Sequence, residues 1–389
     1  MAVRKIPSHP KENRVPDRGR AKVDGIFLFL VLLLLALGLG MLYSASSAQS
    51  LYDTNYATSV LYFSRQALCA LLGLGCMALF SRLKSSFWEG AAWAVYGLTI
   101  LLLLLVLVAG ESVNGARRWI TVAGIQFQPS ELAKFALVLT FARLGKGFGP
   151  KAKDFRYGVL GFGAAMLGIL VPLALEKHLS AIVLLGAVGV ILMFLSGTKA
   201  RYLMGGAALG LAFVGVYVSL MGYAGDRVTA WLHPEADPSD TGYQILQSLY
   251  AIGSGGLFGL GYGKGRQKYL YLPFQYNDYI FAIVCEEVGL VGALLIIALF
   301  AALILRGYWI ALQAPDRFST VLAAGLITLI AVQTVLNLGV VTNLLPSTGI
   351  ALPFFSYGGT ALAVNLGEMG ILLGISRNRN RVSKTEDIL

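Results

Sequence analysis

Charged side chains inside apolar stretches are the residues of this sequence best placed to do chemistry. A charge in the middle of a membrane costs about 2.5 kcal/mol or more, so such residues usually face a cavity or a partner. Glu131 and Lys134 lie in the run that begins at Pro129, and their i,i+3 spacing puts them on one face of a helix. They are either an ion pair that holds two helices together or the lining of a cavity that contacts an ionic headgroup.

Three arginines border other apolar runs. Arg117 and Arg118 directly precede Trp119, and Arg65 stands near the start of an earlier run. Guanidinium groups suit bidentate binding of a diphosphate. The alternative is a structural role, in which the arginines reach out to lipid phosphates at the membrane interface.

Asp278 is the candidate for a catalytic base. It follows a tyrosine-rich segment and enters an apolar run that contains Glu286 and Glu287. Asp is also favoured at helix N-caps, so Asp278 has a purely structural alternative. At least one of the two glutamates should face the interior of a helical bundle, either for function or as a hydrogen-bond partner.

Several polar and glycine-rich segments add to this set. The stretch 253–265 has the composition of a phosphate-binding loop but not the spacing of a P-loop, so we interpret it as a flexible turn. Residues 345–349 and 356–359 predict a broken helix that lines a cavity. Gln333 and Asn337, four residues apart, predict hydrogen bonds between helices.

The composition shows what must position these side chains. Of the 389 residues, 57% are apolar and 13% are charged, and mean hydropathy is +0.71. Soluble domains carry roughly 25% charged residues, so a disordered chain and a typical soluble enzyme are excluded. The net charge of +11 is divided among short clusters between apolar runs, which favours a membrane protein over a nucleic-acid-binding one.

We predict an all-α polytopic membrane protein with ten transmembrane helices, because a span needs about 20 mostly apolar residues. The spans are Gly25–Tyr43, Tyr62–Phe80, Ala91–Val108, Pro129–Leu144, Tyr157–Leu175, Leu179–Leu195, Tyr202–Met221, Tyr279–Leu305, Ser319–Val341 and Pro353–Ile375. The first run is longer than a signal-peptide core of roughly 7–15 residues, so an uncleaved helix is favoured.

The positive-inside rule orients these spans. With a cytoplasmic amino terminus, the inner segments hold most of the 31 basic residues, and both termini are cytoplasmic. The chain then divides into a basic tail (1–23), a membrane domain (24–376) and a second basic tail (377–389). Residues 222–278 form a long extracytoplasmic loop between the seventh and eighth spans, which we expect to fold partly into helices at the membrane surface.

Taken in order, these segments resemble the SEDS family of bacterial envelope proteins, which includes FtsW, RodA and SpoVE. The resemblance covers nearly the whole chain between the tails. It is carried by Arg65-Gln66, Gly115 to Trp119, Gln128 to Lys134, Leu272-Pro273 with Asn277 to Ala282, Glu286-Glu287-x-Gly289, and Pro346 to Gly359. The Cys285-Glu286-Glu287 and Gly367 to Gly370 segments favour an FtsW or SpoVE type.

The resemblance implies a peptidoglycan glycosyltransferase that polymerises lipid II outside the bacterial cytoplasmic (inner) membrane, in division or cell-wall growth. It implies lipid II and undecaprenyl diphosphate as ligands, a class B penicillin-binding protein as transpeptidase partner, divisome or elongation-complex proteins, and no nucleic acid. The family's essential aspartate falls on Asp278. The sequence departs from the family at Tyr276-Asn277, at Phe274 after Leu-Pro, and at Lys177-His178.

In the implied mechanism Asp278 is the general base for the acceptor sugar hydroxyl. The departing diphosphate needs cations, for which Arg65, Arg117, Arg118, Lys134 or a bound divalent ion (Mg or Mn) are candidates, with Glu131 orienting Lys134. No organic cofactor is expected. The predicted substrate-binding residues are Arg65, Arg117, Arg118, Glu131, Lys134, Asn277, Ser356, Tyr357, Gly358 and Gly359.

Two other classes of function fit the same spans. One is a flippase for lipid-linked cell-wall precursors, and the other is a noncatalytic scaffold for a division complex. The arginines and Asp278 on the outer side favour an enzyme over a flippase, which would need headgroup contacts along its whole path.

Overall fold

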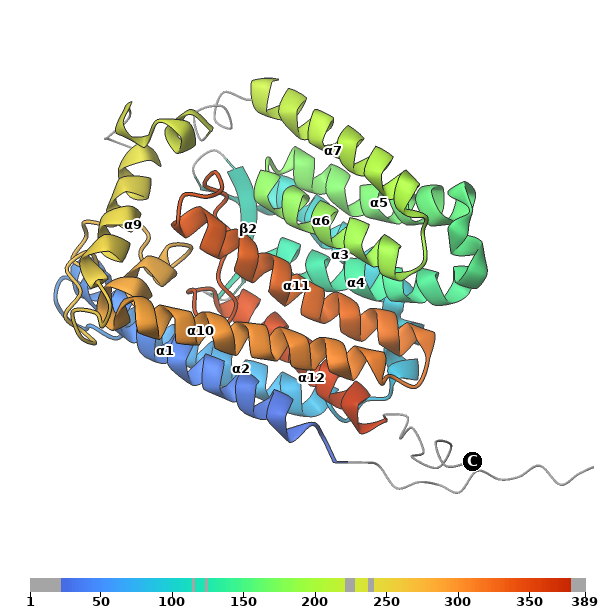
Figure 1. Ribbon diagram of the computed structural model, residues 1–389, viewed down its shortest axis with the longest axis horizontal. Helices are drawn as coiled ribbons and strands as arrows, with labels where there is room; N and C mark the ends of the chain where they lie inside the picture. The colour runs from blue at the N-terminus through green and yellow to red at the C-terminus, as the bar shows by residue number, and fades with distance from the viewer. Residues whose placement is uncertain (1–21, 114–115, 123–124, 221–227, 237–240, 379–389) are drawn as a thin grey trace, which may run out of the picture.

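Long apolar helices make up most of the protein, and the computed structural model describes residues 22–113, 116–122, 125–220, 228–236 and 241–378. Figure 1 shows these helices as a bundle, with α9 at one end and the described end of α12 at the other. The helices are α1 (Gly25–Asp53), α2 (Leu61–Phe80), α3 (Ser85–Ala109), α4 (Pro129–Phe148), α5 (Phe162–Leu175), α6 (Leu179–Leu195), α7 (Ala200–Leu220), α9 (Thr241–Gly255), α10 (Ile280–Leu312), α11 (Arg317–Val341) and α12 (Gly359–Arg377). Short 3₁₀ turns η1 (Gly149–Lys153) and η3 (Pro234–Ala236), the π-helical turn η2 (Arg156–Gly161) and a helical turn at 228–232 complete the helical set.

A helix is present at each of the ten predicted spans. In the described part of the chain, seven segments are long and apolar enough to cross a membrane: α1, α2, α3, η2 with α5, α10, α11 and α12. The helix α6 is apolar but shorter, and α4 carries charges. The protein is therefore a multi-pass membrane protein, and the count of ten crossings stays a prediction.

The two ends of the bundle domain meet at one side. The Asp24 carboxylate caps α1 by accepting from the Phe27 amide at 3.0 Å, and it also pairs with Arg306 of α10 at 2.8 Å. The Asp24 amide donates to the Ser376 hydroxyl near the end of α12 at 3.1 Å. The start of α1 and the end of α12 thus lie side by side, as an even number of crossings requires.

Burial separates a packed interior from an apolar exterior. Residues 133–142 of α4 are buried without interruption, and α11 and α12 are also mostly buried. On α2, by contrast, the side chains of Leu68, Leu71 and Leu72 are more than half exposed. Leucines exposed in such numbers suit contact with lipid rather than water.

The structure contains a small antiparallel sheet, which the all-α prediction did not include. Its strands are β1 (Glu111–Val113), β2 (Ala116–Val122) and β3 (Ile125–Phe127), in the order β1-β2-β3. Trp119, Ile120 and Thr121 are aromatic and β-branched residues, which favour a strand, but the run is too short to stand out beside the long apolar helices. Gly115 of the family segment lies outside the described residues.

The long loop is partly helical, as predicted. The helix α9 packs against the bundle through Ile245, Ser248 and Ala251. The Ser248 hydroxyl donates to the Val341 carbonyl of α11 at 2.9 Å. The residues 222–227 and 237–240 of the predicted loop lie outside the described residues.

The glycine-rich stretch forms turns, and it packs against α10 where that helix is interrupted. Gly289 has φ 69° and ψ −175°, a conformation essentially restricted to glycine. A Cβ on Gly289 would lie 2.3 Å from the Gly259 amide nitrogen, so the two glycines let the backbones meet. The Leu260 and Gly261 amides donate to the Glu286 and Glu287 carbonyls, each at 3.0 Å.

Candidate functional site

One cavity of about 960 Å³ opens between the sheet, α2, α4, α6 and the irregular segment before α12. Ten of the eleven predicted site residues line it. They are Arg65, Arg118, Glu131, Lys134, Asn277, Asp278, Ser356, Tyr357, Gly358 and Gly359. The structure therefore brings together residues that are far apart in sequence, whereas their chemical roles remain predictions.

Arg117 is the predicted residue that does not line this cavity. Arg117 and Arg118 are neighbours on β2, where the pairing with β1 is irregular, and only one of them lines the cavity. Arg118 faces the cavity. Arg117 is exposed and donates through Nη1 to the Leu107 carbonyl at 3.1 Å.

Asp278 lies in the turn that leads into α10, and its side chain is half-buried at the cavity wall. Tyr279, not Asp278, is the N-cap residue of α10, and it makes no side-chain cap. The Asp278 Oδ2 atom lies 3.7 Å from the position that a Cβ on Gly349 would take. The structure therefore gives the N-cap position of α10 to Tyr279, and the role of Asp278 stays a prediction.

Asn337 connects the backbone at this aspartate to the backbone at Ile350. Its Nδ2 donates to the Asp278 carbonyl at 2.6 Å and to the Ile350 carbonyl at 2.8 Å. The predicted hydrogen bonds of Asn337 are thus made to irregular backbone rather than to another helix. Gln333, one turn earlier on α11, lines the cavity.

The segment before α12 is held by Gln66, a fully buried residue of α2. Its Nε2 donates to the Ser356 carbonyl and its Oε1 accepts from the Gly358 amide, both at 3.1 Å. The broken helix predicted at 345–349 and 356–359 is wrong, because turns and irregular backbone lie between α11 and α12, but Gly349 and residues 356–359 do line the cavity. The helix α12 begins at Gly359 rather than at Pro353, where the predicted span starts, because these residues bond to Gln66 instead of to a helical turn.

Aromatic rings stack beside Asn277 and Asp278. The ring of Tyr276 lies 4.5 Å from that of Tyr62 and 5.8 Å from that of Tyr357, measured between centroids. The Tyr357 amide also donates to the Tyr276 carbonyl at 2.8 Å. Rings at a cavity mouth can pack against the face of a sugar, and neither Tyr62 nor Tyr276 was singled out from the sequence.

Glu131 and Lys134 form a nearly buried ion pair, with Oε2 and Nζ 2.6 Å apart and about a tenth of each side chain exposed. Pro129 and the first turn of α4 place them at the cavity floor. Glu368 on α12, itself 3% exposed, interacts electrostatically with both. The pair lies within α4, so it does not itself join two helices; it faces the cavity, and both of its members act electrostatically on Glu368 of α12.

The connection between α5 and α6 adds a residue that the sequence marked only as a family departure. His178 lines the cavity, and its Nδ1 is buried with no hydrogen-bond partner among the described residues. Arg118 lies close by and donates through Nη2 to the Lys177 carbonyl at 2.5 Å. Burial, with Arg118 and Lys134 nearby, lowers the pKa of His178 to about 3, so the ring is neutral at pH 7.

Glu286 and Glu287 of α10 are both buried, and each is 1% exposed. Glu287 pairs with Lys268 at 2.9 Å and accepts from Ser44 of α1 at 2.7 Å. Glu286 accepts from the Arg266 amide at 2.8 Å. The prediction that at least one glutamate faces the interior is confirmed, and the Gly263 and Gly265 amides of the glycine-rich stretch donate to the Glu287 carboxylate.

The described residues do not fit a resident metal centre. They include no group of three or more His, Cys, Asp or Glu side chains that could hold a metal ion. Of the acidic groups that line the cavity, Glu131 is already held by Lys134. We therefore derive no step through a bound metal.

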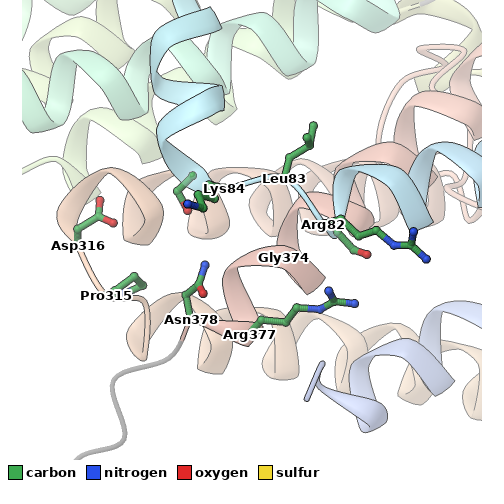
Figure 2. Close-up of a pocket in the computed structure, with 10 residues that line it drawn as sticks. Arg82, Leu83, Lys84, Pro315, Asp316, Gly374, Arg377 and Asn378 are labelled. Carbon is green, nitrogen blue, oxygen red and sulfur yellow. The ribbon is translucent and has the colours of Figure 1, made fainter. Parts of the chain in front are cut away.

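A second, smaller cavity of about 230 Å³ lies near the end of α12 and contains none of the predicted site residues. Figure 2 shows Arg82, Lys84 and Arg377 at this cavity, with Asp316 on its opposite side. It lies between the turn after α2 and the start of α11, at the end of the bundle where α1 begins and α12 ends.

Comparison with known proteins identifies the fold and its cavity. Residues 25–381 match the family model described as "Cell cycle protein", the FtsW, RodA and SpoVE model. The chain belongs to this family. The match spans every described helix, so all the residues that line the cavity lie within the matched range.

Curated relatives share the domain over most of their length. The chain is 40% identical over 339 residues to a probable peptidoglycan glycosyltransferase FtsW of Geobacter metallireducens, covering 86% of this chain and 90% of that protein. It is 39% identical to stage V sporulation protein E of Bacillus subtilis, covering 87% and 92%. It is 37% identical to the peptidoglycan glycosyltransferase MrdB of Escherichia coli, covering 81% and 85%.

Solved structures agree with this assignment. A chain from a peptidoglycan synthase complex, described as coordinating polymerization and crosslinking, matches with a TM-score of 0.77 and 30% identity, covering 92% of this chain and 99% of that one. The rod shape-determining protein RodA of Thermus thermophilus matches with a TM-score of 0.69 and 30% identity, covering 92% and 98%.

Proposed function

We propose that this chain is a peptidoglycan glycosyltransferase that polymerises lipid II into glycan strands. Family membership supports the reaction class. The observation that carries the assignment of the site is that Asp278 lines the same cavity as Arg65, Arg118 and Lys134. A base for the acceptor and cations for a departing diphosphate are the two things that this transfer needs.

In this mechanism the Asp278 carboxylate takes the proton from the 4-hydroxyl of the acceptor sugar. The hydroxyl oxygen forms the new bond to the anomeric carbon of the donor, and the bond from that carbon to undecaprenyl diphosphate breaks. Arg65, Arg118 and Lys134 stabilise the charge that develops on the diphosphate. A single displacement with no enzyme nucleophile inverts the anomeric carbon.

The remaining cavity residues have supporting roles in the proposal. Glu131 orients Lys134, and the half-buried Asn277 lies next to the base. Ser356, Tyr357, Gly358 and Gly359 form the wall beside it. The Ser356 hydroxyl accepts from the Leu352 amide at 2.8 Å, which keeps this wall in one conformation for the substrate.

For the membrane arrangement we propose ten crossings, both termini in the cytoplasm, and the 222–278 loop and the cavity on the outer side of the inner membrane. The adjacent ends of α1 and α12 support an even number of crossings. The basic residues at that end, among them Arg82, Lys84 and Arg377, support a cytoplasmic location by the positive-inside rule.

The proposed partner is a class B penicillin-binding protein, the transpeptidase that crosslinks the new strands, within a divisome or elongation complex. The likeness to a chain of a peptidoglycan synthase complex supports such an assembly. A divalent ion that arrives with the substrate diphosphate also stays part of the proposal. Chelation with EDTA, followed by addition of Mg²⁺ or Mn²⁺, tests it.

The decisive experiment is polymerisation of fluorescent lipid II by the purified protein with its transpeptidase partner. Asp278→Asn should lower the rate by about 100-fold or more, the scale of general-base catalysis, while the protein stays folded. Asp154→Asn, at an exposed acid near η1, is the matched control and should keep full activity. Polymerisation by Asp278→Asn at the wild-type rate would contradict the assignment, and lipid II movement between liposome leaflets without polymerisation would indicate a flippase.

A further inference from the structure

His178 lies among the groups that would bind the substrate diphosphate, and one of its ring nitrogens has no partner among the described residues. This Nδ1 is buried and makes no hydrogen bond there, while the ring as a whole is half-buried and borders the cavity. A buried polar atom without a partner is uncommon and calls for an explanation, such as a missing ligand. A phosphate bound against the ring would bring a hydrogen-bond acceptor to it.

Cations dominate the surroundings of this ring. Arg118 from β2 and Lys134 from α4 both act on it electrostatically. The other charged groups nearby are Glu131, which is paired with Lys134, and Glu176 and Lys177 on the same connection. Asp278 lies elsewhere on the wall of the same cavity.

The connection that carries His178 is held in place. Arg118 donates to the Lys177 carbonyl at 2.5 Å, and the Ser180 hydroxyl donates to the Thr348 carbonyl. These two contacts link the ring's segment to β2 and to the segment that faces Asp278. These contacts therefore fix the position of the imidazole beside Arg118.

We propose that His178 is a further diphosphate-binding residue, which takes up a proton when the diphosphate of the polyprenyl substrate binds between Arg118 and Lys134. This inference rests on the proposed function, because that function supplies the diphosphate. The bound anion offsets the two positive charges that keep the ring neutral. The proton comes from the solvent, and the resulting imidazolium donates a hydrogen bond to a phosphate oxygen.

The direction of the pKa change supports this step. Burial, Arg118 and Lys134 lower the pKa of His178 to about 3. An adjacent anion favours the charged form of histidine and raises that pKa. By linkage, diphosphate binding then tightens as the pH falls, by up to tenfold per pH unit for one proton taken up.

Calorimetry at pH 6 with farnesyl diphosphate as the probe tests the proposal. Titrations in buffers of different ionisation enthalpy give the number of protons taken up per site. Because the diphosphate itself titrates near this pH, the readout is the difference between the wild type and His178→Asn. We expect a difference of a sizeable fraction of one proton, with binding by His178→Asn weaker than wild type by severalfold or more.

His233→Asn, at an exposed histidine of the long loop, is the matched control and should behave as the wild type. His178→Gln gives a second test if the asparagine variant does not fold. Equal proton uptake by the wild type and a folded His178 variant would overturn the inference, and so would the absence of farnesyl diphosphate binding to the wild type.

A lipid II polymerisation assay on the same samples separates this inference from the proposed function. Polymerisation with no His178-dependent proton uptake overturns only the inference. His178-dependent uptake without any polymerisation overturns only the proposed function. In an active wild type, the KM for lipid II should rise between pH 6 and pH 8, and His178→Asn should flatten that rise.

Discussion

At the residue scale, substitutions in the nearly buried Glu131–Lys134 pair can distinguish a structural role of the pair from a chemical one. Lys134→Met leaves Glu131 without its partner, and loss of one member of a buried pair destabilises by about 3–5 kcal/mol. Glu131→Gln with Lys134→Met removes both charges and should recover much of that stability. Thermal unfolding of detergent-solubilised protein measures both effects.

Activity then distinguishes the two roles. If Lys134 binds the diphosphate, the double variant should be stable but should polymerise lipid II at least tenfold more slowly than wild type. The pair Lys146 and Glu89, which lies away from the cavity and is partly exposed, offers a matched control in Lys146→Met with Glu89→Gln. Wild-type activity in the Glu131/Lys134 double variant would mean that the pair has only a structural role.

The charged cavity residues could be predicted from the sequence because a charge in an apolar run costs free energy. Such charges are rare, so they are easy to recognise. It could not show that Arg118 faces the cavity and Arg117 does not, since this depends on the strand β2. Gln66 and Asn337 support the wall through backbone carbonyls of distant segments. A contact with a distant backbone carbonyl leaves no pattern of residue types for sequence reasoning to find.

At the scale of elements, the interruption of α10 at Gly289 determines how the glycine-rich stretch packs. Gly289→Ala should destabilise the protein by about 1–3 kcal/mol, because alanine strains this backbone conformation and its Cβ would meet the Gly259 amide. Gly186→Ala on α6 is the matched control, since a Cβ there meets nothing within 4 Å. Thermal unfolding midpoints compare the two, and equal midpoints would show that the interruption is not required.

The long helices could be predicted from apolar runs alone, although several of them extend beyond the predicted ranges. The ends of the helices near the cavity could not be predicted in this way. The start of α12 is delayed to Gly359 by contacts with α2, and α1 continues to Asp53, beyond its apolar run. The sheet was missed because its strands are short and lie between helices whose hydropathy is much stronger.

At the scale of the whole molecule, the proposed orientation can be read out with single cysteines. Tyr269→Cys, at an exposed position after α9, should react with a membrane-impermeant maleimide in intact spheroplasts. Lys151→Cys, exposed in η1, should react only after the membrane is permeabilised. The wild-type protein, whose Cys69, Cys76 and Cys285 are buried or half-buried, gives the background. Labelling of both positions in intact cells would contradict the arrangement of ten crossings.

The chain from Lys268 to Asp278 is anchored at both ends. Lys268 is tied to Glu287 and Ser44, and the Asp278 carbonyl is tied to Asn337. A stretch fixed at both ends must absorb any change of length within itself, so adding or deleting one residue between Lys268 and Asp278 should shift the aspartate along the cavity wall.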